Sequence, residues 1–317
     1  MTFNDKNPTT SAYRYLFGPV ASRRLGRSLG VDVVPYKVCT YDCIYCEVGR
    51  TTRLTAEREE YVAPAAILDE LTRWLAGNQT PDYVTVTGAG EPTLHSGLGE
   101  IIRGIKRISG APVAVLTNGS LLYRTDVQDD LLEADLVVPS LDAGTDEELQ
   151  RVNRPAAALS LNRLYDGLRV FRQRFHGQLW LEVLLVGGIT DSDESVRRIA
   201  AMVAEVKPDR VQLNTVVRPP ADPHARPVTP ERLAELAAMF TPRAEVIAPT
   251  VREPSTTAVA VTRSDILALL RRRPCPIEEI VSGLGIPRDE AERQLAALEE
   301  AGLIRRRTQN GVEHFSA

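Results

Sequence analysis

The most informative stretch of this chain is Cys39-Thr40-Tyr41-Asp42-Cys43-Ile44-Tyr45-Cys46, which holds three of the four cysteines among its 317 residues. A structural zinc site takes four nitrogen or sulfur ligands, which usually come as two separated pairs. No fourth ligand lies close in the sequence, because Cys275 is far along the chain and the nearest histidine is His95. Three thiolates without a local fourth ligand suit a [4Fe–4S] cluster that leaves one iron open. A zinc site and another kind of iron–sulfur site remain alternatives.

The composition is that of an ordinary soluble globular protein, with 43% hydrophobic and 25% charged residues. The length predicts one large domain and one small domain. The formal net charge is -4, so the overall charge indicates neither a nucleic-acid partner nor a membrane partner. The N-terminal residues lack the apolar stretch of a signal peptide, and the longest apolar run, 179–189, is interrupted by Glu182. Clustered cysteines without an export signal indicate metal binding, and we expect a cytoplasmic protein.

Strand and helix patterns alternate along most of the chain. We expect residues 1–16 to form a loose arm, and a β-branched strand over 31–34 to lead into the cysteines. Further strands are predicted over 83–87, 113–116, 136–138, 179–186 and 210–217, and helices over 65–76, 98–108, 127–132, 161–175, 195–206 and 230–240. This alternation predicts parallel β-α-β units whose strands are buried on both faces. A full or partial (β/α) barrel and an open doubly wound sheet both fit, and either one places its chemistry at the carboxyl ends of the strands.

Small and polar residues follow each of these predicted strands. Glycines let a backbone approach a ligand closely, and short hydroxyl and amide side chains can hydrogen-bond a sugar or a carboxylate without filling a pocket. Turns and helix caps use the same residue types, so each segment alone has a purely structural alternative. The segments are Thr87-Gly88-Ala89-Gly90-Glu91-Pro92, Leu116-Thr117-Asn118-Gly119, Pro139-Ser140-Leu141-Asp142-Ala143, Val186-Gly187-Gly188-Ile189 and Gln212-Leu213-Asn214-Thr215.

The cysteine spacing, the aromatic residue before the last cysteine and the Gly-Ala-Gly-Glu-Pro segment together resemble the radical S-adenosylmethionine (SAM) superfamily. Within that superfamily, the chain resembles the group related to wyosine-tRNA synthetases. The resemblance implies a partial (β/α)6 TIM-like barrel over 17–253 and the cofactors [4Fe–4S] and SAM. It also implies an external one-electron reductant and cleavage of SAM to a 5′-deoxyadenosyl radical that takes a hydrogen atom from a substrate.

The resemblance also implies a role for individual residues. Cys39, Cys43 and Cys46 would bind three irons, and SAM would bind the fourth through its amino and carboxylate groups. Tyr45 would lie near the adenine, unless it only packs. The remaining SAM contacts would come from the glycine segment, from the next two strand ends and from the backbone of the fifth, namely Gly88, Gly90, Glu91, Pro92, Thr117, Asn118, Ser140, Asp142, Gly187 and Gly188.

Three further residues are expected to face the substrate, namely Asn214, Arg218 and Arg154. An arginine such as Arg154 can grip a carboxylate or a phosphate with two hydrogen bonds, although a solvated helix end would explain it equally well. Arg23, Arg24 and Arg27 either line the mouth of the substrate site or lie on the surface. An RNA nucleotide is the favoured substrate, followed by a peptide side chain or a partner protein that carries a glycyl radical, as for an activase.

A second, smaller domain is predicted over 262–317, after a linker over 254–261 rich in Pro, Ser and Thr. Three helices and a hairpin with an Asn-Gly turn closely resemble a winged helix-turn-helix domain. This domain carries nine arginines and nine acidic residues, whereas a nucleic-acid module normally has a clearly basic face. Contact with a nucleic acid and a protein-contact or structural role therefore both remain open. An iron–sulfur transcriptional sensor is the main rival to an enzyme, but a sensor would need only the cysteines.

Overall fold

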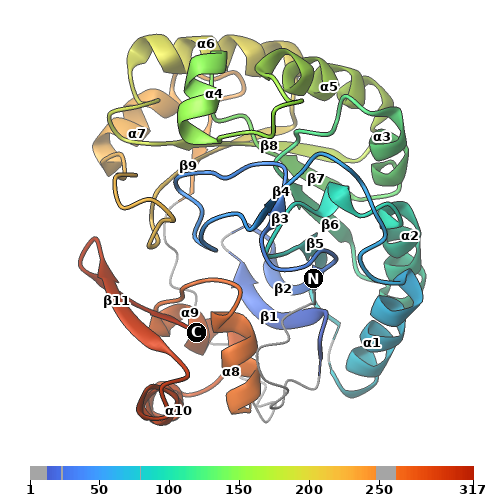
Figure 1. Cartoon of the computed structure of the whole chain (residues 1–317), viewed down its shortest axis with the longest axis vertical. Coiled ribbons are helices and arrows are strands. Elements are labelled where there is room, and N and C mark those ends of the chain that lie inside the picture. The colour runs from blue at the N-terminus through green and yellow to red at the C-terminus, as the bar shows by residue number, and fades with distance from the viewer. Residues whose placement is uncertain (1–12, 23, 79, 248–261) are drawn as a thin grey trace.

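The computed structural model describes residues 13–22, 24–78, 80–247 and 262–317 (Figure 1). The expected linker and residues 1–12 of the expected arm lie outside these ranges. Residues 13–16 are not loose, because the backbone N–H groups of Arg14, Tyr15 and Leu16 all donate to the buried carboxylate of Glu70.

The described residues form a curved, eight-stranded sheet that carries its helices on the outer face (Figure 1). Its order is β1-β2-β5-β6-β7-β8-β9-β10, and every neighbouring pair after β1 is parallel. The parallel strands are β2 (Gly26–Asp32), β5 (Tyr83–Thr87), β6 (Val113–Thr117), β7 (Leu136–Pro139), β8 (Gln178–Leu185), β9 (Arg210–Thr215) and the short β10 (Glu245–Val246). The predicted partial (β/α)6 barrel is confirmed.

The outer helices follow the apolar periodicity of the sequence. They are α1 (Pro64–Gly77), α2 (Leu98–Ser109), α3 (Thr125–Leu131), α4 (Asp146–Val152), α5 (Leu161–Arg174), α6 (Asp193–Val206) and α7 (Pro230–Ala237). In α2, for example, Ile101, Ile102 and Ile105 are fully buried against the sheet, and Gly110 ends the helix in a left-handed conformation. Two short parallel strands, β3 (Val38–Cys39) and β4 (Arg53–Leu54), and the 3-10 helix η1 (Pro92–Leu94) lie in the loops above the sheet.

The first strand differs from its prediction. Instead of a strand over 31–34, β1 (Leu16–Ser22) and β2 form an antiparallel hairpin that ends at Asp32. The strand pairing shifts between Phe17 and Val20, which interrupts the regular alternation of residues in β1. Because of this irregularity and the glycines, the sequence lacks the alternating pattern from which the hairpin could have been predicted.

The C-terminal residues form the predicted winged helix, with α8 (Arg263–Leu270), α9 (Ile277–Leu284), α10 (Arg288–Glu300), β11 (Arg305–Gln309) and β12 (Val312–Ser316). The hairpin turn at Asn310 and Gly311 has φ angles of 52° and 76°, as an Asn-Gly turn requires. The winged helix packs directly on the barrel, because Phe17 and Val20 of β1 belong to the same buried cluster as its helices. Arg272, next to α8, adds an ion pair with Asp32 and lies over the ring of Phe17.

No helix in the described part of the chain combines the length and the apolar character that crossing a membrane requires.

Candidate active site

A cavity of about 300 Å³ lies where the carboxyl ends of the parallel strands converge. Residues from the cysteine loop and from five strand ends line it, although they are up to 179 positions apart in the sequence (39 to 218). Twelve of the residues predicted from the sequence meet in this one cavity: Cys39, Cys43, Tyr45, Cys46, Gly88, Gly90, Glu91, Thr117, Asn118, Ser140, Asn214 and Arg218.

Hydrogen-bond donors surround the cysteine sulfurs. Lys37 is buried and its Nζ lies 3.0 Å from Cys46 Sγ, while the side-chain amide of Asn153 donates to Cys43 Sγ at 3.5 Å. Cys39 Sγ accepts from a backbone N–H at 3.5 Å and from the Asn118 amide at 3.7 Å. Burial raises the pKa of the Cys39 thiol to about 12, so this sulfur needs a compensating positive charge to exist as a thiolate.

Donors of this kind are the groups that tune the thiolates of iron–sulfur sites, so the residues present fit such a cluster. Within the residues that the structure describes, no three His, Cys, Asp or Glu side chains are grouped to hold a single metal ion. A zinc ion would need each of its sulfur ligands to lie about 2.3 Å from the metal.

Glu91 connects two of the strand ends. Its carboxylate is buried, and it accepts hydrogen bonds from the backbone N–H and hydroxyl of Thr93, from the hydroxyl of Thr117 and from the backbone N–H of Asn118, at 2.6–3.0 Å. Burial raises the pKa of Glu91, while these hydrogen bonds lower it. Because the side chain of Asn118 also bonds to Thr40 in the cysteine loop, Glu91 fixes the floor of the cavity.

Asp142 lies behind Tyr45 and does not line the cavity. Its carboxylate accepts hydrogen bonds from the Tyr45 hydroxyl, from the Asn153 amide at 2.9 Å and from the backbone N–H of Leu184 at 2.9 Å. Burial raises the pKa of Asp142 to about 6. The acid therefore orients the aromatic side chain that stands directly before Cys46.

The two glycines of the second strand end line the cavity, yet their missing side chains face the protein. A Cβ at Gly88, whose φ is 137°, would collide with Asp32, and one at Gly90 would collide with the carbonyl of Val38. Glycine is therefore required because the segment packs tightly against the first strand and the cysteine loop.

Other predicted residues lie away from this cavity. Pro92 is buried at the start of η1, and Arg154 forms an ion pair with Asp222 at 3.0 Å. Gly187 and Gly188 belong to a turn in which Gly187 donates to the carbonyl of Arg226 and Gly188 donates to an aspartate side chain. The cavity lining also leaves out Asp142, as described above.

Three charged lining residues, Arg24, Glu47 and Glu182, were missed or left undecided from the sequence. Glu182 lies in the middle of β8, forms an ion pair with Arg24 at 2.6 Å and accepts a hydrogen bond from Asn214 at 2.8 Å. A single carboxylate inside an otherwise apolar parallel strand was the signal that could have identified it. Arg24 indeed lines the site, and Glu47, directly after the last cysteine, lines it as well. Thr87 and Thr215 also line the cavity, and both stand in the strand-end segments quoted above, where neither was assigned a role.

Arg218 joins the barrel to the winged helix. Its side chain is 5% exposed, and its guanidinium forms an ion pair with Glu47 and donates to both carboxylate oxygens of Glu279 in α9 at 2.9 and 2.8 Å. Fully buried arginines need such partners, because an unpaired charge in the interior is costly. The loop that carries Cys46 is thereby connected to the C-terminal domain.

The fold and the convergence of these strand ends define a class of protein. Residues 33–203 match the radical SAM superfamily, and the chain belongs to that superfamily. Residues 262–307 match a helix-turn-helix domain, in agreement with the winged helix.

Several known proteins are similar to this chain. It is 37% identical to the UPF0026 protein MJ1312 of Methanocaldococcus jannaschii, over 71% of this chain and 70% of that protein. It is also 37% identical to a Brachyspira hyodysenteriae protein named GTPase Obg, over 95% of this chain but only 45% of that longer protein. The present sequence thus spans less than half of the length of that protein. A dual-specificity RNA methyltransferase, RlmN of Nitratidesulfovibrio vulgaris, is 28% identical over 62% of this chain and 55% of that protein.

Two solved structures share the fold. A structure of TYW1 with a lysine-pyruvate adduct bound superposes with a TM-score of 0.52 and 17% identity, over 72% of this chain and 76% of that chain. A radical SAM methyltransferase from Sphaerobacter thermophilus superposes with a TM-score of 0.53 and 19% identity, over 69% of this chain and 65% of that chain. At these identities the likeness concerns the architecture alone.

Proposed function

We propose that this protein is a radical SAM enzyme whose cluster is held by Cys39, Cys43 and Cys46. The observation that carries the proposal is that these cysteines share one cavity with the polar ends of the parallel strands. When bound, the cluster and SAM supply the reductive cleavage of SAM, with one electron from an external reductant, to methionine and a 5′-deoxyadenosyl radical that takes a hydrogen atom from the substrate.

The protein's own residues would bind and orient these groups. Glu91 and Asn118 hold the cavity floor in place, and Gly90, Thr117 and Ser140 offer polar atoms to SAM. Asp142 and Asn153 would position the Tyr45 ring beside the cluster, and Lys37 would compensate the negative charge on Cys46.

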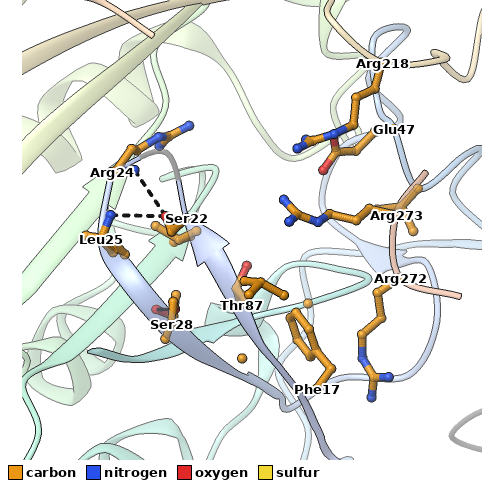
Figure 2. Close-up of a pocket in the computed structure, with 16 residues that line it drawn as sticks. Phe17, Ser22, Arg24, Leu25, Ser28, Glu47, Thr87, Arg218, Arg272 and Arg273 are labelled. Atoms are coloured by element: carbon orange, nitrogen blue, oxygen red, sulfur yellow. Dashed lines mark hydrogen bonds and ion pairs between the residues drawn. The ribbon is translucent and has the colours of Figure 1, made fainter. Parts of the chain in front are cut away.

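The proposed substrate is a nucleotide of an RNA. The similarity to a protein named as an RNA methyltransferase supports this choice. A second cavity of about 180 Å³ also adjoins the first, and it would give a nucleotide room beside the cluster (Figure 2). Arg24, Glu47 and Arg218 line both cavities, and Figure 2 shows Arg24 across the second cavity from the other two.

A transcriptional sensor is less well supported, because α10, the helix that would enter a DNA groove, has its arginines neutralised. Arg288 pairs with Glu278 and Glu292, and Arg293 pairs with Glu290.

The test is the formation of 5′-deoxyadenosine by oxygen-free, reconstituted protein given dithionite and SAM, followed by chromatography. We expect product from the wild type and from a Cys275→Ala variant, since Cys275 is buried in the winged helix. We expect none from Cys43→Ala. Equal product from Cys43→Ala, or a wild-type protein that binds neither iron nor SAM, would refute the proposal.

A further inference from the structure

A groove of about 260 Å³ lies between the cysteine loop and the winged helix. Tyr36 and residues 47–49 form one wall, and Pro219 and Pro220 lie after β9. The other wall comes from the segment after α8 and from the wing, and it contributes the arginines 271, 272, 273, 305 and 307. Glu47 is the only acidic side chain among the described residues that line the groove.

The three consecutive arginines of β11 lie on opposite faces of the strand. Neighbouring residues of a strand point to opposite sides, so Arg305 and Arg307 share the face that lines the groove. Arg306 points away, where it pairs with Glu299 at 2.9 Å and lies over the ring of Phe315.

The positive charge of the groove is not compensated by neighbouring acids. Arg271, Arg305 and Arg307 have no side-chain hydrogen bond or ion pair with any residue that the structure describes. By contrast, Arg272 pairs with Asp32, and Arg273 pairs with Glu279. The equal numbers of arginines and acids in 262–317 thus conceal a separation of charge. Glu278, Glu290, Glu292 and Glu299 pair with arginines outside the groove, whereas Glu279 pairs with Arg273, so the groove keeps a surplus of positive charge.

An exposed aromatic ring lies in the same groove. Tyr36 is 43% exposed, and its hydroxyl donates to the carbonyl of Val48 at 2.6 Å, which fixes the ring beside the cysteine loop. Arginines that follow a backbone and aromatic rings on which bases stack are the two features by which proteins bind single-stranded nucleic acid.

The groove also leads to the proposed active site. It shares Glu47, Val48, Arg272 and Arg273 with the second cavity, which itself shares Glu47, Arg218 and Gly88 with the cavity of the cysteines. Figure 2 shows Arg273 reaching into that second cavity and Arg272 directed away from its centre. A strand anchored in the groove could therefore extend one unstacked nucleotide toward the cysteine loop.

We propose that this groove binds a single-stranded segment of RNA, with Arg271, Arg305 and Arg307 on its phosphates and Tyr36 stacked on a base. The inference rests on the proposed function and specifies where its substrate is held. The winged helix would thus contact RNA with its wing and the end of α8, and not with α10.

The test is the binding of a fluorescein-labelled, 15-nucleotide oligo(U) RNA to reconstituted full-length protein, measured by anisotropy at several salt concentrations. Each phosphate contact to a single strand contributes a slope of about -0.7 to the plot of log K against log salt. We expect Arg305→Ala/Arg307→Ala to weaken binding and make the slope shallower by about 1.4. Arg306→Ala, on the opposite face of the same strand, is the matched control and should bind as the wild type does.

Three results would overturn the inference. The first is a salt slope that is unchanged in the double variant, and the second is an equal loss of RNA affinity in Arg306→Ala. The third is a 15-residue poly-Glu peptide that competes as well as unlabelled RNA does, which would indicate an acidic protein partner instead. The wild-type assay for 5′-deoxyadenosine separates this failure from a failure of the proposed function. If the product forms but RNA does not bind through these arginines, only the assignment of the groove is wrong.

Discussion

The buried carboxylate of Glu91 offers a quantitative test of how the cavity is built. Glu91→Ala leaves the backbone N–H groups of Thr93 and Asn118 without their acceptor, while the two hydroxyl donors can rotate toward other partners. A buried donor without a partner costs about 1–3 kcal/mol, so we expect the variant to lose about 4 kcal/mol of unfolding free energy. Glu91→Gln keeps one acceptor oxygen and should lose about 2 kcal/mol.

Equilibrium urea unfolding of the metal-free protein, followed by tryptophan fluorescence, measures these losses. Both tryptophans, Trp74 in α1 and Trp180 in β8, belong to the barrel, so the signal reports the unfolding of that domain. Glu194→Ala is the control, because this side chain is 82% exposed and should leave the midpoint unchanged. A Glu91→Ala variant within about 1 kcal/mol of that control would refute the hydrogen-bond network described here.

Three further perturbations test the domain contact and the cluster environment. Arg218→Ala should cost about 3 kcal/mol in the same unfolding assay, because it leaves two carboxylates without their buried partner. Gly30→Ala should cost about 1–3 kcal/mol, because a Cβ there collides with the ring of Phe17. Lys37→Met should lower the reduction potential of the reconstituted cluster by on the order of 60 mV, measured by redox titration followed by electron paramagnetic resonance, because it removes a positive charge 3.0 Å from Cys46 Sγ.

Each of these changes has a matched control. Arg169→Ala removes an exposed arginine with two acidic partners, and Gly77→Ala adds a Cβ that meets nothing within 4 Å. Lys106→Met removes an exposed lysine on the outer helix α2 and should leave the reduction potential unchanged. If a control shows the same loss of unfolding free energy, or the same shift of the reduction potential, as its test variant, the stated cause of that variant's effect is wrong.

The order of the barrel elements was predictable because each carries its own periodic signal. The strand over 83–87 and the helix starting at Leu98 agree with the structure at those positions, since β5 is rich in β-branched residues and α2 has one apolar face. The β1–β2 hairpin was not predictable, because β1 is stabilised by packing of Phe17 and Val20 against the winged helix and not by a local pattern.

The site was predictable to the extent that its residues stand at strand ends. Which of them reach the cavity depends on rotations that the sequence does not encode, and so Asp142 supports Tyr45 from behind instead of lining the cavity. Arg218 was expected to face a substrate, whereas its guanidinium bridges two glutamates, one of them 61 positions away in α9. Long-range ion pairs of this kind leave no trace in a local motif.

The most direct test of the central claim is a combined metal analysis and electron paramagnetic resonance experiment on the reduced, reconstituted protein. We expect about four irons per chain and a reduced-cluster signal that changes when SAM is added, because the open iron would bind it. Cys39→Ala should lose the signal. A protein that holds one zinc and no iron, or a cluster whose signal is indifferent to SAM, would contradict the account.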